Sequence, residues 1–229
     1  HMAILAVILG FLPGFAWLYF YMQEDPHPEP KGLIFKTFCF GMVGAVFALV
    51  LELLFNQYVP AQSGSIFMMV GSLVGLSLIE EVAKFFSAKT AVQNNPAFNE
   101  PIDAMIYSLV AALGFATLEN LGALVSPFVN PSGLASMSSI FEMVSFRFVG
   151  ATLLHALTGA IIGYYWAWSI REFGRKRILI AGIAIATLLH AFFNYLILNF
   201  ESYLQPIIFL MIVGFFVLSD FEKFKNKKI

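Results

Sequence analysis

The sequence predicts an all-α, polytopic integral membrane protein: a bundle of about seven transmembrane helices, or eight, running N-out and C-in. Of its 229 residues, 59% are hydrophobic and only 12% are charged. A soluble domain carries about 25% charged residues, because its surface must face water. The apolar residues gather in runs of roughly 20, the length that crosses a bilayer. Lys and Arg are concentrated in alternate connections, as topology rules for membrane proteins require.

Uninterrupted apolar stretches predict seven spans, separated by polar segments rich in turn-forming residues. These spans are 3–22, 33–55, 65–92, 101–125, 140–170, 178–199 and 203–219. We find neither an internal repeat nor an appended soluble domain, so we expect 1–229 to be a single transmembrane domain. The His1-Met2 start is typical of a cloning scar and is set aside.

Positive charge predicts the orientation. If the 171–177 connection is cytoplasmic, alternation places 23–32, 89–100 and 220–229 on the same side. Twelve of the thirteen Lys and Arg residues then lie at the cytoplasmic side, and only Arg147 does not. The opposite orientation reverses this bias, so we expect the N-terminus outside and the C-terminus inside.

Charge and cysteine content exclude several classes of protein. A net charge of -1 argues against nucleic acid as a partner, so the expected environment is the lipid bilayer. The lone cysteine, Cys39, excludes a disulfide framework and a thiolate metal cluster.

A few ionisable side chains remain inside the predicted spans, where a charge costs roughly 2.5–3.5 kcal/mol on insertion scales. The 1.5 Å rise per helical residue gives their depth from the cytoplasmic helix ends. Glu80 lies roughly 22 Å in, Glu119 roughly 27 Å, His155 roughly 24 Å and His190 roughly 20 Å. Four helices thus present carboxylates and imidazoles at comparable depth, which predicts one polar site within the membrane.

Local spacings support a packed site. His190 and Asn194 are separated by four residues and share a helix face. His155, Gly159 and Gly163 also recur every four residues, and the glycines allow a neighbouring helix to approach closely.

Other polar residues have simpler interpretations. Lys84 lies one turn after Glu80 and can pair with it or extend to the cytoplasmic surface, while Glu81 points about 100° away. Asp103 lies 16 residues before Glu119, too far to share its site, and is interpreted as a first-turn acid of its helix. We interpret Glu52, Glu142 and Arg147 as structural or interfacial.

Four blocks of sequence resemble a known family. They are LIEEVAKFF at 78–86, NEPIDAMIYSLVAALGFATLEN at 99–120, LLHALTGAIIGYY at 153–165 and LLHAFFNY at 188–195. Together they resemble the PrsW family of intramembrane proteases, relatives of the CAAX prenyl-protein endopeptidases. The signature of those relatives is EExxxR, FxxxH and HxxxN. Glu80-Glu81 match the acids, Glu119 stands where FxxxH has histidine, and His190 with Asn194 match HxxxN.

The resemblance implies cleavage of a membrane-anchored protein. In bacterial members of the family this substrate is an anti-sigma factor, so a single-pass anti-sigma factor is the implied partner. The implied location is the bacterial cytoplasmic membrane. The oligomeric state is left open.

The implied reaction is amide hydrolysis, which needs an activated water and stabilisation of an oxyanion. The candidate catalytic residues are Glu80, Glu81, Glu119, His155, His190 and Asn194. A desolvated carboxylate is a stronger base than one in water, so we assign the base to Glu80 or Glu81.

The remaining candidates take supporting roles. His190 and Asn194 are the candidate oxyanion donors, and His155 and Glu119 would orient the water or carry the proton to the leaving amine. We expect no cofactor in this mechanism.

Two alternatives stay open. Glu119, His155 and His190 supply a two-histidine, one-carboxylate set that suits a zinc-dependent protease, although no HExxH motif is present. A proton-coupled transporter or a non-catalytic membrane scaffold would use the same polar residues as a relay. A serine nucleophile is disfavoured, because the sequence has no GxSxG-type elbow.

Overall fold

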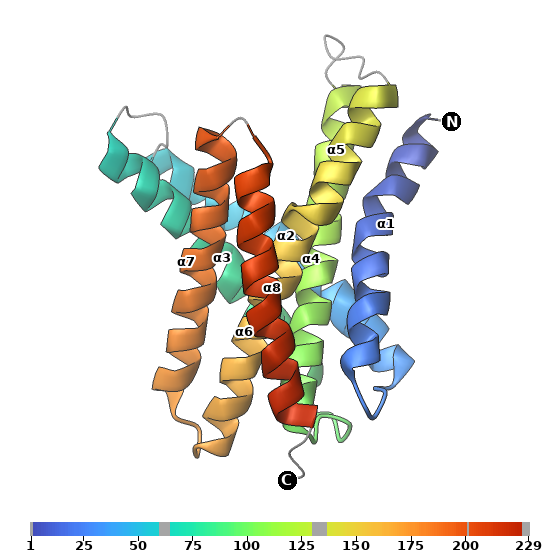
Figure 1. Cartoon of the computed structure of the whole chain (residues 1–229), viewed down its shortest axis with the longest axis vertical. Helices are drawn as coiled ribbons and strands as arrows, with labels where there is room; N and C mark the ends of the chain where they lie inside the picture. The colour runs from blue at the N-terminus through green and yellow to red at the C-terminus, as the bar shows by residue number, and fades with distance from the viewer. Residues whose placement is uncertain (1, 60–64, 130–136, 201, 226–229) are drawn as a thin grey trace.

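The computed structural model describes residues 2–59, 65–129, 137–200 and 202–225, and within these ranges the chain is a bundle of α-helices without a strand (Figure 1). The helices are α1 Met2–Tyr21, α2 Lys31–Tyr58, α3 Ile66–Val92, α4 Pro101–Val129, α5 Met137–Val149, α6 Ala151–Arg171, α7 Lys176–Asn199 and α8 Leu204–Lys225, with a short 3-10 turn at Met22–Glu24 after α1. The predicted all-α membrane class is confirmed.

Among the described residues, six helical segments are long and apolar enough to cross a membrane. They are Lys31–Tyr58, Ile66–Val92, Pro101–Leu124, Glu142–Arg171, Lys176–Asn199 and Leu204–Phe224. The remaining predicted span, 3–22, corresponds to the 20-residue helix α1. The connections 22–30, 93–100 and 172–175 lie at one end of the bundle, as the predicted alternation requires (Figure 1). The direction of insertion stays a prediction.

The predicted span 140–170 is interrupted at Gly150, between α5 and α6. Gly150 has φ −96° and ψ −91°, which is outside the helical region. Backbone hydrogen bonds nevertheless continue across it: Gly150 N–H donates to Phe146 at 2.8 Å, and Leu154 N–H donates to Gly150 at 2.9 Å. The segment is therefore one span built from two helices.

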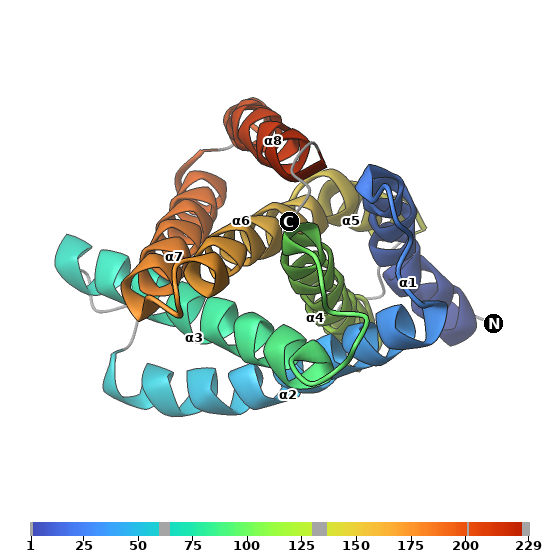
Figure 2. The same cartoon turned by 90° about the horizontal axis from the view of Figure 1, so that it is seen from below.

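Helix α4 occupies the middle of the bundle. It packs against α1, α2, α3 and α6, and Figure 2 shows these helices around it. Every residue from Pro101 to Thr117 is buried. The buried face includes polar side chains, among them Ser108 and Asn120. Such residues are tolerated at membrane depth because neighbouring helices, rather than lipid, surround them.

Small residues bring α6 against α4, as their spacing predicts. A Cβ at Gly163 would overlap the backbone of Ala104, and a Cβ at Gly159 would collide with the side chain of Ala112. Without these side chains the two helix backbones approach closely. This contact places His155, one turn before Gly159, beside the half of α4 that carries Glu119.

The connection before α2 packs against the beginning of α4. The Tyr107 hydroxyl donates to Glu29, and Asp103 accepts hydrogen bonds from the backbone of Asn99 at 2.8 Å and Glu100 at 2.7 Å. Asp103 thus serves the first turn of α4, as predicted, and takes no part in the site around Glu119.

Candidate active site

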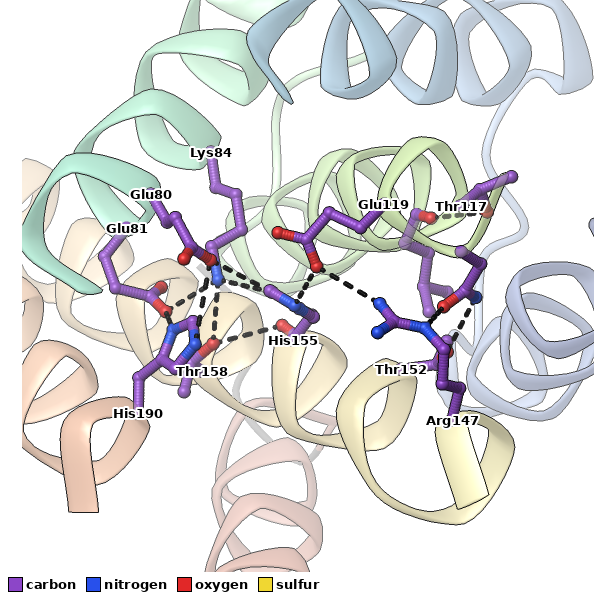
Figure 3. A network of polar contacts seen from close by, with 12 residues as sticks. Glu80, Glu81, Lys84, Thr117, Glu119, Arg147, Thr152, His155, Thr158 and His190 are labelled. Carbon is purple, nitrogen blue, oxygen red and sulfur yellow. Dashed lines mark hydrogen bonds and ion pairs between the residues drawn. The ribbon is translucent and has the colours of Figure 1, made fainter. Parts of the chain in front are cut away.

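Three residues that lie within about one turn of α3 form one side of the site. Glu80, Glu81 and Lys84 are each at most 8% exposed, and their side chains point toward His155 of α6 and His190 of α7 (Figure 3). The depth estimate that predicted a shared site is therefore matched by the geometry.

Glu81 is held by two donors. Lys84 Nζ donates to Glu81 Oε1 at 2.6 Å, and His190 Nδ1 lies 2.7 Å from the same oxygen. Lys84 also donates to Thr158 Oγ1 of α6 at 3.2 Å. The predicted pairing of Lys84 with Glu80 is wrong. On a helix, position 84 projects between positions 80 and 81, and Thr158 with His190 draws the ammonium toward Glu81.

His155 is oriented by Glu119. Its Nε2 lies 2.9 Å from Glu119 Oε2, and because an ionised carboxylate only accepts, this nitrogen carries the hydrogen. The lone pair is then on Nδ1, which lies 3.0 Å from Lys84 Nζ and 4.0 Å from Glu80 Oε2.

His190 is oriented in the same way by Glu81. Its Nδ1 donates to that carboxylate at 2.7 Å, and its Nε2 lies 3.6 Å from Glu80 Oε2. The rings of His155 and His190 are nearly perpendicular, with centroids 5.1 Å apart. Each histidine therefore has one nitrogen on a carboxylate and the other on the side of Glu80.

Among the described residues, Glu80 differs from the other acids of the site in having no Lys or Arg partner within 4 Å. Glu81 pairs with Lys84, and Glu119 lies 3.5 Å from the guanidinium of Arg147. Glu80 Oε2 is buried and makes no hydrogen bond within the part of the chain that the structure describes. A buried carboxylate oxygen without a donor is costly, so this position calls for a proton, a water molecule or a cation beside it.

The same three residues fit a zinc ion. Ligand atoms of Glu80, His155 and His190 lie within 4.8 Å of one another. Two imidazoles and a carboxylate are a common zinc donor set. The second nitrogen of each histidine donates to a carboxylate, the contact that usually orients a metal-binding histidine. The carboxylate of this set is Glu80 and not the predicted Glu119, because Glu119 contacts Nε2 of His155 and the nitrogen nearer to the other ligands is Nδ1. The Lys84 ammonium, already at Nδ1 of His155, would compete with the ion.

Arg147 extends the network to α5. Its Nε donates to Asn120 Oδ1 at 2.5 Å, and Asn120 Nδ2 donates to Thr152 Oγ1 at 3.0 Å (Figure 3). Arg147 thus holds Glu119 and Asn120, a structural role at the edge of the site. The available signal was its position, since it is the one basic residue outside the predicted cytoplasmic set.

Asn194 is not brought into the cluster. It is half-buried on α7, one turn after His190, and makes no hydrogen bond or ion pair with the residues that the structure describes. Thr158 is the residue that the sequence reading missed. Its only signal was its position three residues after His155, on the same helix face.

Fold and site together define a class of protein. A polytopic helix bundle that buries carboxylates and histidines around one glutamate has the groups that an intramembrane hydrolase needs. The family model described as "PrsW family intramembrane metalloprotease" matches residues 29–219. The chain belongs to this family of intramembrane proteases.

Curated relatives are similar in sequence to this chain along most of their length. The protein named Protease PrsW in Geobacillus kaustophilus is 29% identical over 199 residues, covering 85% of this chain and 80% of that protein. Its namesake in Bacillus subtilis is 28% identical over 230 residues, covering 95% and 94%. The one in Clostridioides difficile is 26% identical over 225 residues, covering 96% and 91%. No solved structure matches the chain.

Proposed function

We propose that this protease hydrolyses a peptide bond of a membrane-anchored protein with a water molecule activated at Glu80. The observation that carries the proposal is the buried Glu80 Oε2, which accepts no hydrogen bond from the described residues and lies between Nδ1 of His155 and Nε2 of His190, at 4.0 and 3.6 Å. This replaces the open choice between Glu80 and Glu81, because Glu81 is already bonded to Lys84 and His190.

In this mechanism Glu80 takes a proton from water while the water oxygen bonds to the scissile carbonyl carbon. The resulting oxyanion needs donors, and the Lys84 ammonium is the nearest cation. Glu80 then returns the proton to the amide nitrogen as the carbon–nitrogen bond breaks. Glu81 and Glu119 hold the two histidines in one orientation throughout.

The metal-dependent alternative uses the same residues differently. Glu80, His155 and His190 would hold a zinc ion, which supplies Lewis-acid activation of water and carbonyl. Glu80 would then be a ligand, and Glu119, which is partly exposed, would be the candidate base.

The substrate proposal is a single-pass membrane protein of the anti-sigma-factor type, cleaved in a bacterial cytoplasmic membrane. Its support is the membership of the family and the bacterial origin of the relatives.

The decisive variant is Glu80→Gln, which keeps the size of the side chain and removes its basicity. We expect cleavage of a single-pass substrate by the purified protein in lipid vesicles to fall by at least about 100-fold, the usual contribution of a general base. Chelator treatment followed by zinc addition separates the two mechanisms, because lost and restored cleavage requires a metal.

The matched control is Glu142→Gln, an exposed carboxylate of α5 outside the cluster. It should cleave like the unmodified protein. Equal cleavage by Glu80→Gln would contradict the assignment of Glu80.

A further inference from the structure

A cavity of about 400 Å³ opens beside the site, between α2, α4 and α5. Apolar side chains such as Phe115 and Leu118 form part of its wall. Three ionisable residues also line it: Glu52 from α2, Glu119 from α4 and Arg147 from α5. Since Glu119 also bonds His155 at 2.9 Å, the cavity reaches the outer edge of the catalytic cluster.

The charges of this cavity do not balance. Arg147 compensates Glu119 at 3.5 Å. Glu52 is half-buried and forms no hydrogen bond or ion pair with the residues that the structure describes. One carboxylate in the wall therefore lacks a partner of opposite charge.

An unpaired acid within a membrane span calls for a functional explanation, because it is costly to insert. Glu52 lies six residues before the end of α2, roughly 9 Å along the helix. An acid needed only for solubility would point to that helix end and the water beyond it. Glu52 instead lines the same cavity as Glu119.

We propose that this cavity receives the substrate segment and that Glu52 binds a basic side chain, Lys or Arg, close to the scissile bond. The proposal rests on the proposed function and adds a specificity residue to it. The cavity is large enough for a few peptide residues, and a basic group at Glu52 would complete the charge balance of its wall. Arg147 is already engaged by Glu119 and Asn120, so Glu52 is the carboxylate of this wall that is left for a basic side chain.

The test is a series of single-pass substrates that carry Lys, Gln or Glu at each position near the cut. The readout is the ratio of kcat/KM for the Lys and Glu substrates at the most sensitive position. We expect the unmodified protein to prefer the Lys substrate by about tenfold or more, because Glu52 would attract Lys and repel Glu in an apolar site. Glu52→Gln should bring the ratio close to one, and Glu52→Lys should invert it.

The ratio compares two substrates on the same protein sample. It therefore stays the same when part of the enzyme is unfolded. Where Glu52→Lys cleaves too slowly to measure, the same ratio is read as binding to Glu80→Gln protein with and without the Glu52→Lys change. Glu142→Gln, on α5 but outside this cavity, should leave the ratio unchanged.

The outcomes separate the two proposals. If the unmodified protein cleaves and Glu80→Gln does not, but the ratio is the same in every Glu52 variant, the role of Glu52 is refuted and the proposed function stands. The role of Glu52 is also refuted if its variants lose the same fraction of kcat/KM toward the Lys substrate and the Glu substrate. If the unmodified protein cleaves no member of the series, the proposed function itself fails.

Discussion

Glu80 and Glu81 are neighbours in the chain but have opposite environments. Glu81 shares one oxygen between Lys84 and His190, at 2.6 and 2.7 Å, and is a fixed part of the framework. Glu80 Oε2 accepts no hydrogen bond from the described residues and lies 3.6 Å from Nε2 of His190. A helix turns about 100° between adjacent residues, which is enough to send one carboxylate to a structural pair and the other to the chemistry.

A second acid with an unusual environment lies outside the membrane-spanning helices. Burial, together with the neighbouring carboxylates of Asp103 and Asp25, raises the pKa of Glu29 from 4.5 to about 7, and the hydrogen bond from Tyr107 only partly opposes this. Between these two values the folded protein binds the proton more tightly than the unfolded chain. Stability should therefore fall as pH rises from about 4.5 to about 7.

We expect the thermal unfolding midpoint in detergent to be higher near pH 5 than near pH 7.5, with a smaller difference in Glu29→Gln. Glu172→Gln, whose carboxylate lies on an exposed connection, serves as the control and should retain the full difference. An unchanged pH profile in Glu29→Gln would show that Glu29 does not carry the effect.

At the scale of the elements, the contact between α4 and α6 depends on glycine. We expect Gly163→Ala to destabilise the protein by about 1–3 kcal/mol, the usual cost of overpacking, because the new Cβ would overlap the backbone of Ala104. It should also lower cleavage, since the contact positions His155 beside Glu119. Thermal unfolding and cleavage assays measure the two effects.

The matched control is Gly71→Ala in α3, where a Cβ meets nothing within 4 Å. Alanine is the better helix former by roughly 0.5–1 kcal/mol, so this variant should be at least as stable as the unmodified protein. Similar destabilisation by both changes would argue against close packing as the cause.

The sequence predicts helices better than it predicts contacts. Helix ends agree within six residues, because apolar runs and polar connections are local features. Depth along each helix also brought Glu80, Glu119, His155 and His190 to one level. The partner of Lys84 was beyond this reasoning, because positions 80 and 81 are both within its reach and residues of α6 and α7 decide between them.

Contacts between distant helices were likewise not predictable. Arg147 and Glu119 lie on different helices, and nothing in their local sequence encodes the pairing. The break at Gly150 was hidden for another reason: a single glycine within an apolar run is compatible with both a straight and an interrupted helix.

For the whole molecule, the direction of insertion can be measured with single cysteines in a Cys39→Ser background. Phe173 is fully exposed in the connection between α6 and α7, and Asn199 is exposed at the opposite end of α7. Positive charge predicts that Phe173→Cys faces the cytoplasm. A membrane-impermeant maleimide added to intact cells should therefore label Asn199→Cys and spare Phe173→Cys. The reverse pattern would invert the topology.

Helix α4 is surrounded by protein from Pro101 to Thr117, so this part of it contacts neighbouring helices and not lipid. Lipid meets the bundle mainly on outer helices such as α2 and α8, whose exposed side chains are largely apolar. Changes in bilayer thickness or composition must therefore act on this part of α4 indirectly, by moving the helices that enclose it. Glu80, His155 and His190, each at most 8% exposed, are shielded in the same way from the membrane in which their substrate is dissolved.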